Sequence, residues 1–154
     1  MTVQAIPAGC NTVNAYLVVK DAEASIDFYT KAFGGEGGAC LRAPDGSVMH
    51  AEIRIGNSTI MLSQENPAWE LKSAETLGGS PVSLHLYVED ADALFKQAID
   101  AGCTEVAPLM DAFWGDRFGK VCDPFGLQWS IATHVEDVSP AERDRRAQAW
   151  FASM

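Results

Sequence analysis

The sequence predicts an α+β protein built from two tandem strand–helix–strand–strand–strand (βαβββ) units and a short C-terminal helix. An internal repeat is the first reason: LVVKDAEASI at 17–26 is similar to LYVEDADALF at 86–95. The second is that three short strand-like runs follow each copy. The half-units are expected at about 12–63 and 81–135, inside one domain of residues 1–138, with a linker at 64–80 and a helix within 139–154.

Each repeat joins an apolar strand to a helix through an aspartate. The first strands are expected at about 14–19 and 83–88, ending at Asp21 and Asp90, whose carboxylates can cap the helices. Apolar residues at helical spacing predict helices that stop at Gly34 and Gly102.

Three strand-like runs are expected after each helix. In the first unit they cover about 39–42, 49–55 and 59–63, and in the second 104–108, 118–122 and 128–133. Near the C-terminus, Ser139-Pro140 opens a capping box, so a helix should follow with Trp150, Phe151 and Met154 on one face.

The charge balance excludes some function classes. The 154 residues carry 21 Asp and Glu against 11 Lys and Arg, a net charge of −10. Nucleic-acid binding draws on Lys and Arg, so we expect no nucleic-acid partner. We also expect no membrane partner, because no apolar run is long enough to span a bilayer, and no signal peptide is visible at the N-terminus.

The four cysteines, Cys10, Cys40, Cys103 and Cys122, form no Cys-x-x-Cys pair. A zinc knuckle or a redox motif is therefore not indicated. An even number could form disulfides, but without a secretory signal we expect reduced thiols in a cytoplasmic protein.

Several motifs together resemble one known superfamily. They are SIDFYTKAFG at 25–34, MHAEIRIG at 49–56, WGDRFG at 114–119, DPFG at 123–126 and IATHVEDV at 131–138. The chain resembles the vicinal oxygen chelate (VOC) superfamily of glyoxalases, bleomycin-resistance proteins and dioxygenases, in its PhnB-like, glyoxalase-like branch. The resemblance covers about residues 12–138. It implies a curved mixed sheet around a cleft and a homodimer.

The resemblance also locates the positions that bind a metal ion in metal-dependent members. They correspond here to Asn14, Met61, Ser83 and Ser130. Neutral oxygens and one thioether do not replace His and carboxylate ligands. We therefore expect no metal and no cofactor.

Strand alternation predicts which side chains line the cleft. One face of the strands is apolar and should meet the helices, and the other is half polar, as in a small-molecule site. The expected wall residues are Asn14, Tyr16, Met61, Ser83, His85, Tyr87, Gln128 and Ser130. The alternative is a sheet face open to water.

Loop residues add to this wall. Trp69 and Trp114 are expected at the pocket or an interface, and Phe118 and Phe125 at the edge of the core or in a dimer contact. Arg117 could bind a ligand anion or tie down its loop through backbone carbonyls.

Two catalytic alternatives stay open. His50, Glu52 and His85 could converge on a displaced metal site, or His50 and Glu52 could simply bond to each other while His85 hydrogen-bonds in the pocket. Without a metal, His85 could act as an acid–base group with Tyr16 or Tyr87.

The leading hypothesis is a metal-independent protein that binds a small, aromatic or cationic organic ligand in the cleft. The bleomycin-resistance proteins are the analogy. The alternative hypothesis is a glyoxalase-like lyase or isomerase that uses the displaced metal or the His/Tyr chemistry.

Overall fold

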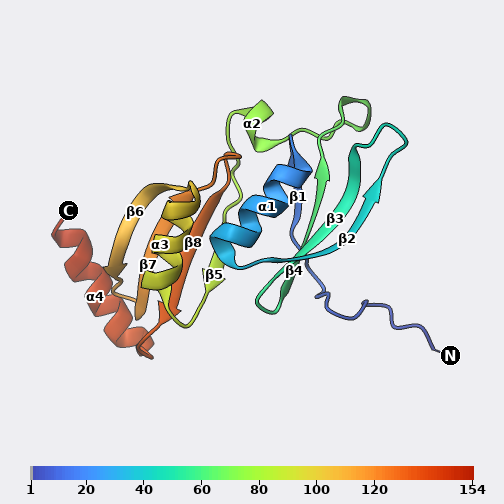
Figure 1. Ribbon diagram of the computed structural model, residues 1–154. Coiled ribbons are helices and arrows are strands. Elements are labelled where there is room, and N and C mark those ends of the chain that lie inside the picture. Colours follow the sequence, from blue (N-terminus) through green and yellow to red (C-terminus); the bar gives the residue numbers. More distant parts are fainter. Residues whose placement is uncertain (1) are drawn as a thin grey trace. The chain divides into compact units, whose positions relative to one another are not determined.

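A computed structural model describes residues 2–154 (Figure 1). The chain divides into two compact units, the first ending at Ser80 and the second covering Pro81–Met154. The first unit contains β1 (Tyr16–Val19), α1 (Ala22–Phe33), β2 (Glu36–Arg42), β3 (Val48–Ile55), β4 (Ser58–Gln64), the 3-10 helix η1 (Pro67–Trp69) and α2 (Ala74–Leu77). The second contains β5 (Leu84–Tyr87), α3 (Ala91–Ala101), β6 (Thr104–Asp111), β7 (Asp116–Cys122), β8 (Gln128–His134) and α4 (Pro140–Ala152).

The two units have the same sheet topology. Strand order is β1-β4-β3-β2 in the first sheet and β5-β8-β7-β6 in the second. The outer pairs β1–β4 and β5–β8 are parallel, and the other neighbours are antiparallel. The predicted tandem βαβββ units with a C-terminal helix are thus confirmed, as two mixed four-stranded sheets.

The helices begin and end at the residues that the sequence indicated. Asp21 accepts a hydrogen bond from the Ala24 amide at 3.0 Å, and Asp90 accepts one from the Ala93 amide at 2.9 Å. Gly34 has a φ of 69°, the left-handed conformation that ends α1 at little steric cost.

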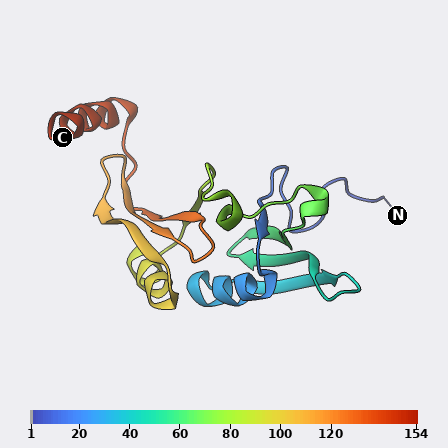
Figure 2. The same ribbon diagram turned by 90° about the horizontal axis from the view of Figure 1, so that it is seen from above.

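Each sheet buries one face against one helix. Val19, Ile53 and Leu62 are almost fully buried on the α1 side of the first sheet, and Trp129 and Ile131 are fully buried in the second. Figure 2 shows α1 along one side of its sheet. Burying each such side chain contributes about 1.5–3 kcal/mol. The predicted apolar face is thus buried against the helix in both sheets, but β8 does not alternate in burial, because Ser130 and Ala132 on its other face are buried too.

The repeat extends to a turn that the sequence comparison did not include. Ala43 and Ala112 each open a turn in which their amides donate to the carbonyls of Ser47 and Asp116, both at 2.8 Å. Each turn places a glycine at a positive φ, 89° at Gly46 and 102° at Gly115. Both halves therefore build the hairpin between their second and third strands in the same way.

Two segments differ from the sequence expectation. The linker 64–80 contains η1 and α2, because Asn66 and Ser73 cap these short helices through their side chains. Strand β6 continues to Asp111 although it contains Pro108, which has no amide to donate. The strand tolerates this proline because it lies at the sheet edge and its register shifts between Ala107 and Met110.

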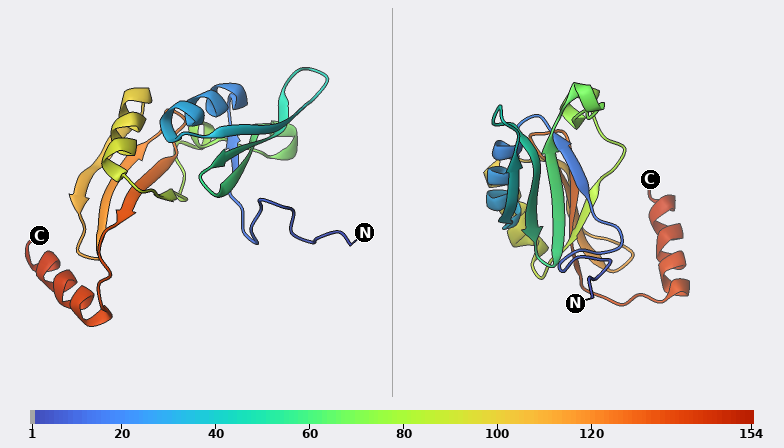
Figure 3. Two further views of the ribbon diagram at one scale, coloured as in Figure 1. Left: turned by 60° about the horizontal axis from the view of Figure 1, so that its bottom comes forward. Right: turned by 90° about the vertical axis from the view of Figure 1, so that its right-hand side faces the viewer.

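Helix α4 follows the second sheet through a short connector (Figure 3). Arg146 ties the helix back to that connector through two bonds to Glu136, at 2.8 and 2.9 Å. Phe113 meets Trp150 with ring centroids 5.8 Å apart, while Phe151 and Met154 stay exposed. Across residues 2–154, no helix is both long and apolar enough to span a membrane.

Candidate functional site

The second sheet carries a cluster of rings on the face away from α3, which we call the aromatic face. It consists of His85 and Tyr87 on β5, Phe118 on β7 and Trp114 in the turn before β7. His85 contacts Tyr87 edge-on with centroids 4.6 Å apart and stacks beside Phe118 at 6.1 Å. Trp114 meets Phe118 edge-on at 5.4 Å.

The strand register explains why these rings meet. His85 and Tyr87 pair with Ser130 and Ala132 of β8, and Phe118 pairs with the same Ala132. Both β8 side chains are small and buried. The rings of the outer strands can therefore approach each other over the middle strand, where a larger residue would keep them apart.

A buried carboxylate lies at one end of the aromatic face. Asp116 is only 2% exposed and accepts hydrogen bonds from Tyr87 Oη at 3.0 Å, Trp114 Nε1 at 3.0 Å and His134 Nδ1 at 2.7 Å. His134 Nε2 in turn bonds to Asp137 at 2.8 Å. Asp116 thus fixes two of the rings and a histidine at once.

These contacts set the charge of the cluster. Burial raises the pKa of Asp116, but the hydrogen bonds from His134, Tyr87 and Trp114 outweigh it, so the net shift of the pKa is downward. The bonds to Asp137 and Asp116 raise the pKa of His134. Even with His134 protonated, the two carboxylates leave a net negative charge.

A shallow hollow adjoins the aromatic face. It has a volume of about 430 Å³ and is lined by Tyr87, Val88, Glu89, Thr133 and His134. Tyr87 is 65% exposed although its hydroxyl is held by Asp116, so its ring presents a fixed apolar surface. The hollow combines that surface with the carboxylate of Glu89, an arrangement that suits a flat cation.

The first sheet has its own cluster on the face away from α1. Tyr16 Oη lies 3.1 Å from His50 Nδ1, and His50 Nε2 lies 3.3 Å from Glu52 Oε1. Met61 on β4 pairs with both Tyr16 and Glu52 in the register, so the three strands share this face. Tyr16 is 49% exposed, and the cluster is open to solvent at that end.

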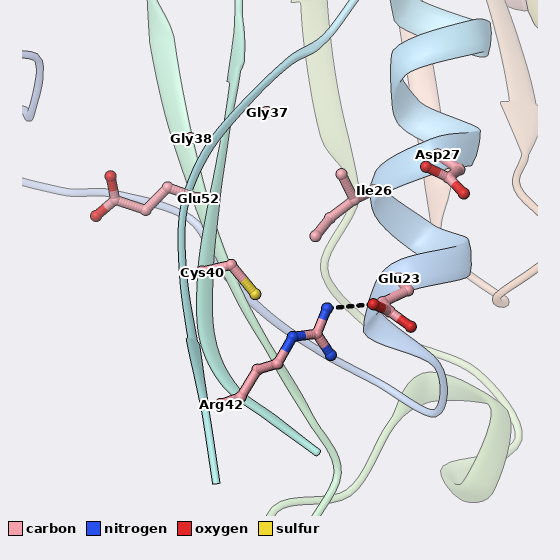
Figure 4. Close-up of a pocket in the computed structure, with 8 residues that line it drawn as sticks. All are labelled: Glu23, Ile26, Asp27, Gly37, Gly38, Cys40, Arg42 and Glu52. Carbon is pink, nitrogen blue, oxygen red and sulfur yellow. Dashed lines mark hydrogen bonds and ion pairs between the residues drawn. The ribbon is translucent and has the colours of Figure 1, made fainter. Parts of the chain in front are cut away.

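A second hollow of about 430 Å³ lies on the other side of the first sheet, between α1 and β2 (Figure 4). Gly37 and Gly38 leave it without side chains on one wall, and the Arg42–Glu23 ion pair crosses its end. Glu52 contributes to the lining, but Figure 4 shows its carboxylate pointing away from α1. None of the predicted wall residues lines this hollow.

The positions that hold a metal in metal-dependent VOC proteins do not fit one here. The amide of Asn14 is engaged in two bonds with the Asn11 backbone, at 2.8 and 2.6 Å. Met61 offers a thioether, and Ser83 and Ser130 offer neutral hydroxyls. A divalent ion with His and carboxylate preferences finds no matching donor set in these residues.

The alternative metal site is not assembled within either unit. His50 and Glu52 bond to each other, as the simpler reading expected, while His85 belongs to the other unit. Among residues 2–154, no group of three or more His, Cys, Asp or Glu is arranged to hold a metal ion. His85 makes ring contacts, and the expected hydrogen bond to its ring is not formed among the described residues.

The predicted wall residues divide between the two units. Tyr16 and Met61 share the open face of the first sheet, with Asn14 just before it. His85, Tyr87, Gln128 and Ser130 share the open face of the second, with Ser83 just before β5. Trp114 joins the second group. Trp69 lies in η1 of the first unit and is 57% exposed.

Arg117 lies elsewhere. It pairs with Thr133 in the register, on the helix-covered face of the second sheet. Its guanidinium donates to Asp92 in the first turn of α3, at 2.9 and 3.1 Å, and not to loop carbonyls. Arg117 therefore fastens the helix to the sheet, and bonds to carboxylates take the place of the loop-carbonyl bonds that were one of its two expected roles.

Sequence reasoning missed three members of the second cluster. Phe118 was expected at the edge of the core or in a dimer contact, and its ring lies on the aromatic face. Asp116 and His134 are far apart in sequence and become neighbours only through the β7–β8 register. The available signal was the alternation of β7, which puts Asp116 and Phe118 on one face.

Sequence comparison with known proteins assigns the chain to one family. Residues 10–131 match the sequence pattern of the Glyoxalase/Bleomycin resistance protein/Dioxygenase superfamily. An uncharacterized protein of Mycobacterium bovis is 43% identical over 133 residues, which is 84% of this chain and 88% of that protein. The Escherichia coli protein YjdN is 34% identical over 91 residues, 59% of each chain.

Solved structures share the fold. The Arabidopsis thaliana protein At5g48480 is 27% identical, with a TM-score of 0.64 over 79% of this chain and 98% of that one. A PhnB protein from Bacillus cereus, described as a putative methyltransferase, is 18% identical, with a TM-score of 0.61 over 80% of this chain and 99% of that one. At that identity, the second similarity concerns the fold alone.

Proposed function

Because the chain belongs to the Glyoxalase/Bleomycin resistance protein/Dioxygenase superfamily, we propose that it acts as a metal-independent binding protein for a small, flat, cationic organic molecule. The superfamily includes both enzymes and binding proteins, so membership alone selects neither. The choice rests on the residues of this chain.

One observation carries the proposal: the aromatic face is built around an ionised, buried carboxylate. Ring faces attract cations through their quadrupole, and flat ligands stack on them. Asp116 holds Tyr87 and Trp114 in place, so these rings lose little conformational freedom when a ligand binds. The adjoining hollow, which includes Glu89, adds a further negative charge.

The side chains at the four metal positions of the superfamily support binding without a metal ion. Asn14, Met61, Ser83 and Ser130 stand where metal-dependent relatives need imidazole and carboxylate. The net charge of −10 favours a cationic ligand at long range but does not choose among cations. Residence in the cytoplasm and assembly into a homodimer remain parts of the proposal.

A thermal-shift comparison tests the function. Proflavine, a flat cation, and acridone, a neutral molecule of similar outline, are each added to the protein in EDTA. We expect proflavine to raise the melting temperature in a concentration-dependent way and acridone to have a much smaller effect. Equal shifts for both, or a shift only when a divalent metal replaces EDTA, would contradict the proposal.

Two variants locate the effect. Phe118→Ala removes a ring of the aromatic face and should reduce the proflavine shift several-fold. The control, Phe28→Ala, alters an aromatic residue of α1 in the other unit. An equal reduction in both variants would move the binding site away from the aromatic face.

A further inference from the structure

Tyr16, His50 and Glu52 form a continuous hydrogen-bonded row across the open face of the first sheet. The row runs from Tyr16 Oη to His50 Nδ1 at 3.1 Å and from His50 Nε2 to Glu52 Oε1 at 3.3 Å. It lies in the other unit from the aromatic face, and no part of the binding proposal uses His50 or Glu52.

The carboxylate determines how the imidazole is protonated. An ionised carboxylate only accepts hydrogen bonds, so His50 presents its Nε2–H to Glu52. In the neutral ring, Nδ1 then carries a lone pair and accepts the proton of the Tyr16 hydroxyl. Among the described residues, Arg54 of the same strand forms no ion pair with Glu52, and its Nε donates to the Gly56 carbonyl at 3.1 Å.

This order of hydrogen-bond donors and acceptors is that of a proton relay. A base is oriented by a carboxylate behind it and receives the proton of a hydroxyl in front of it, as in hydrolytic triads. The hydroxyl end is the accessible one: Tyr16 is 49% exposed, whereas the side chains of His50 and Glu52 are 32% and 35% exposed. A substrate would therefore meet Tyr16 first.

We propose that Tyr16, His50 and Glu52 form a metal-independent proton-transfer site that acts on a neutral organic molecule with a weakly acidic C–H bond. Tyr16 Oη takes the proton as the C–H bond breaks, and its own proton passes to His50 Nδ1. The electron pair stays on the substrate, either delocalised into a carbonyl group or expelling a leaving group. Returning the proton to another carbon completes an isomerisation, and no oxidant or reductant is needed.

The acidic group behind the relay selects the charge of the substrate. Glu52 disfavours an anionic substrate at this face and stabilises the imidazolium that forms during transfer. Tyr16 touches the substrate and is the catalytic residue together with His50, which receives the proton. Glu52 acts through His50 and is a positioning residue.

A nitrobenzisoxazole probe tests the site without knowledge of the natural substrate. A base removes its ring proton, the N–O bond breaks, and a coloured phenolate is released, so the rate reports proton abstraction alone. We expect the full-length protein in EDTA to accelerate this reaction over buffer. Tyr16→Phe and His50→Gln should each lower the catalysed rate by at least about tenfold, since positioned acid–base groups contribute 10²–10⁴-fold.

The control is Glu36→Gln, which changes an exposed carboxylate of the same sheet outside the row. It should leave the rate unchanged, and circular dichroism should show that all variants are folded. No acceleration by the unsubstituted protein, or an equal rate in Tyr16→Phe, His50→Gln and Glu36→Gln, would overturn the proposal.

The role of Glu52 has a separate readout. Nitrogen NMR of the His50 ring should show the Nε2–H tautomer in the unsubstituted protein and a mixture of tautomers in Glu52→Gln. An unchanged ring spectrum in Glu52→Gln would overturn the positioning role. Binding of proflavine is expected to be normal in all these variants, so failure of this proposal is distinguishable from failure of the binding function.

Discussion

Asp116 shows how one residue can organise a site. Its buried carboxylate accepts hydrogen bonds from the phenol of Tyr87, the indole of Trp114 and the imidazole of His134. Each of these side chains comes from a different strand or turn. An isolated buried charge would be costly, but three donors compensate the lost hydration. The same contacts link the stability of the second unit to pH.

The linkage has a defined sign. His134 has a pKa above its ordinary value of 6.5, so its contribution to stability is full below that pH and is lost as the pH rises through the raised pKa. Asp116 has a pKa below its ordinary value of 3.8, so the pH dependence has the opposite sign. Its contribution to stability is present above pH 3.8 and is lost as the pH falls through the lowered pKa.

We therefore predict that His134→Gln is less stable than the unsubstituted protein at about pH 6, and that the difference shrinks towards about pH 9. Urea unfolding at a series of pH values measures it. Asp116 and Asp137 are the charged partners of His134, so Asp137→Asn should reduce the pH dependence as well. A difference in unfolding free energy that stays constant over this range would contradict the assignment.

The cysteines give a second prediction at this scale. The four cysteines are free thiols, as the sequence indicated. Burial raises the pKa of Cys103 to about 12, whereas Cys40 is exposed beside the hollow of the first unit. Because the thiolate is the reactive form, iodoacetamide at neutral pH should label Cys40 and leave Cys103 unmodified until the protein is unfolded in urea. Peptide mass analysis showing rapid labelling of Cys103 in the folded protein would contradict this burial.

At the scale of elements, the turn between β7 and β8 depends on one side chain. Asp123 is buried and accepts hydrogen bonds from the amides of Phe125 and Leu127 and from Trp129 Nε1, each at 2.9 Å. Trp129 is fully buried, so this bond joins the turn to the core of the second unit.

We predict that Asp123→Asn destabilises the protein by about 2 kcal/mol, because the new amide group would face the Trp129 N–H with a donor in place of an acceptor. Urea unfolding gives the magnitude. The control, Asp100→Asn, removes an exposed ion pair with Lys96 and should cost less than about 0.5 kcal/mol. Equal costs for both variants would show that the turn does not depend on Asp123.

The elements could be predicted from sequence because their signals are local. Capping aspartates, terminal glycines and strand alternation lie within a few residues of the structure they determine, and α1, α3 and the apolar, helix-covered face of each sheet are confirmed. The extension of β6 past Pro108 could not be predicted, because edge position and register shift are properties of the assembled sheet.

The clusters on the open faces were harder to predict. Tyr87 and His85 were expected on one face by alternation, but Asp116, Phe118 and His134 join them through a pairing register that no local pattern specifies. Arg117 lies one residue from both Asp116 and Phe118 and yet faces the helix. Neighbouring residues of a strand point to opposite faces, so membership in the WGDRFG motif alone could not tell which face Arg117 occupies.

For the whole molecule, the duplicated βαβββ plan agrees with the family match. Each unit of this chain carries a different cluster on equivalent strands: a Tyr–His–Glu row on the first sheet, and rings around a carboxylate on the second. The two copies of the βαβββ unit therefore share a backbone topology and carry different side-chain clusters on their open faces.

The central claim, metal-independent binding of a flat cation at the aromatic face, is tested most directly by NMR of the tryptophan indole N–H groups during a proflavine titration in EDTA. The chain has four tryptophans, and Trp114 belongs to the aromatic face while Trp129 lies fully buried against Asp123. We predict a saturable shift of the Trp114 signal with little change at Trp129. A Trp114 signal that does not move while proflavine binds, or that moves only after a divalent metal is added, would contradict the claim.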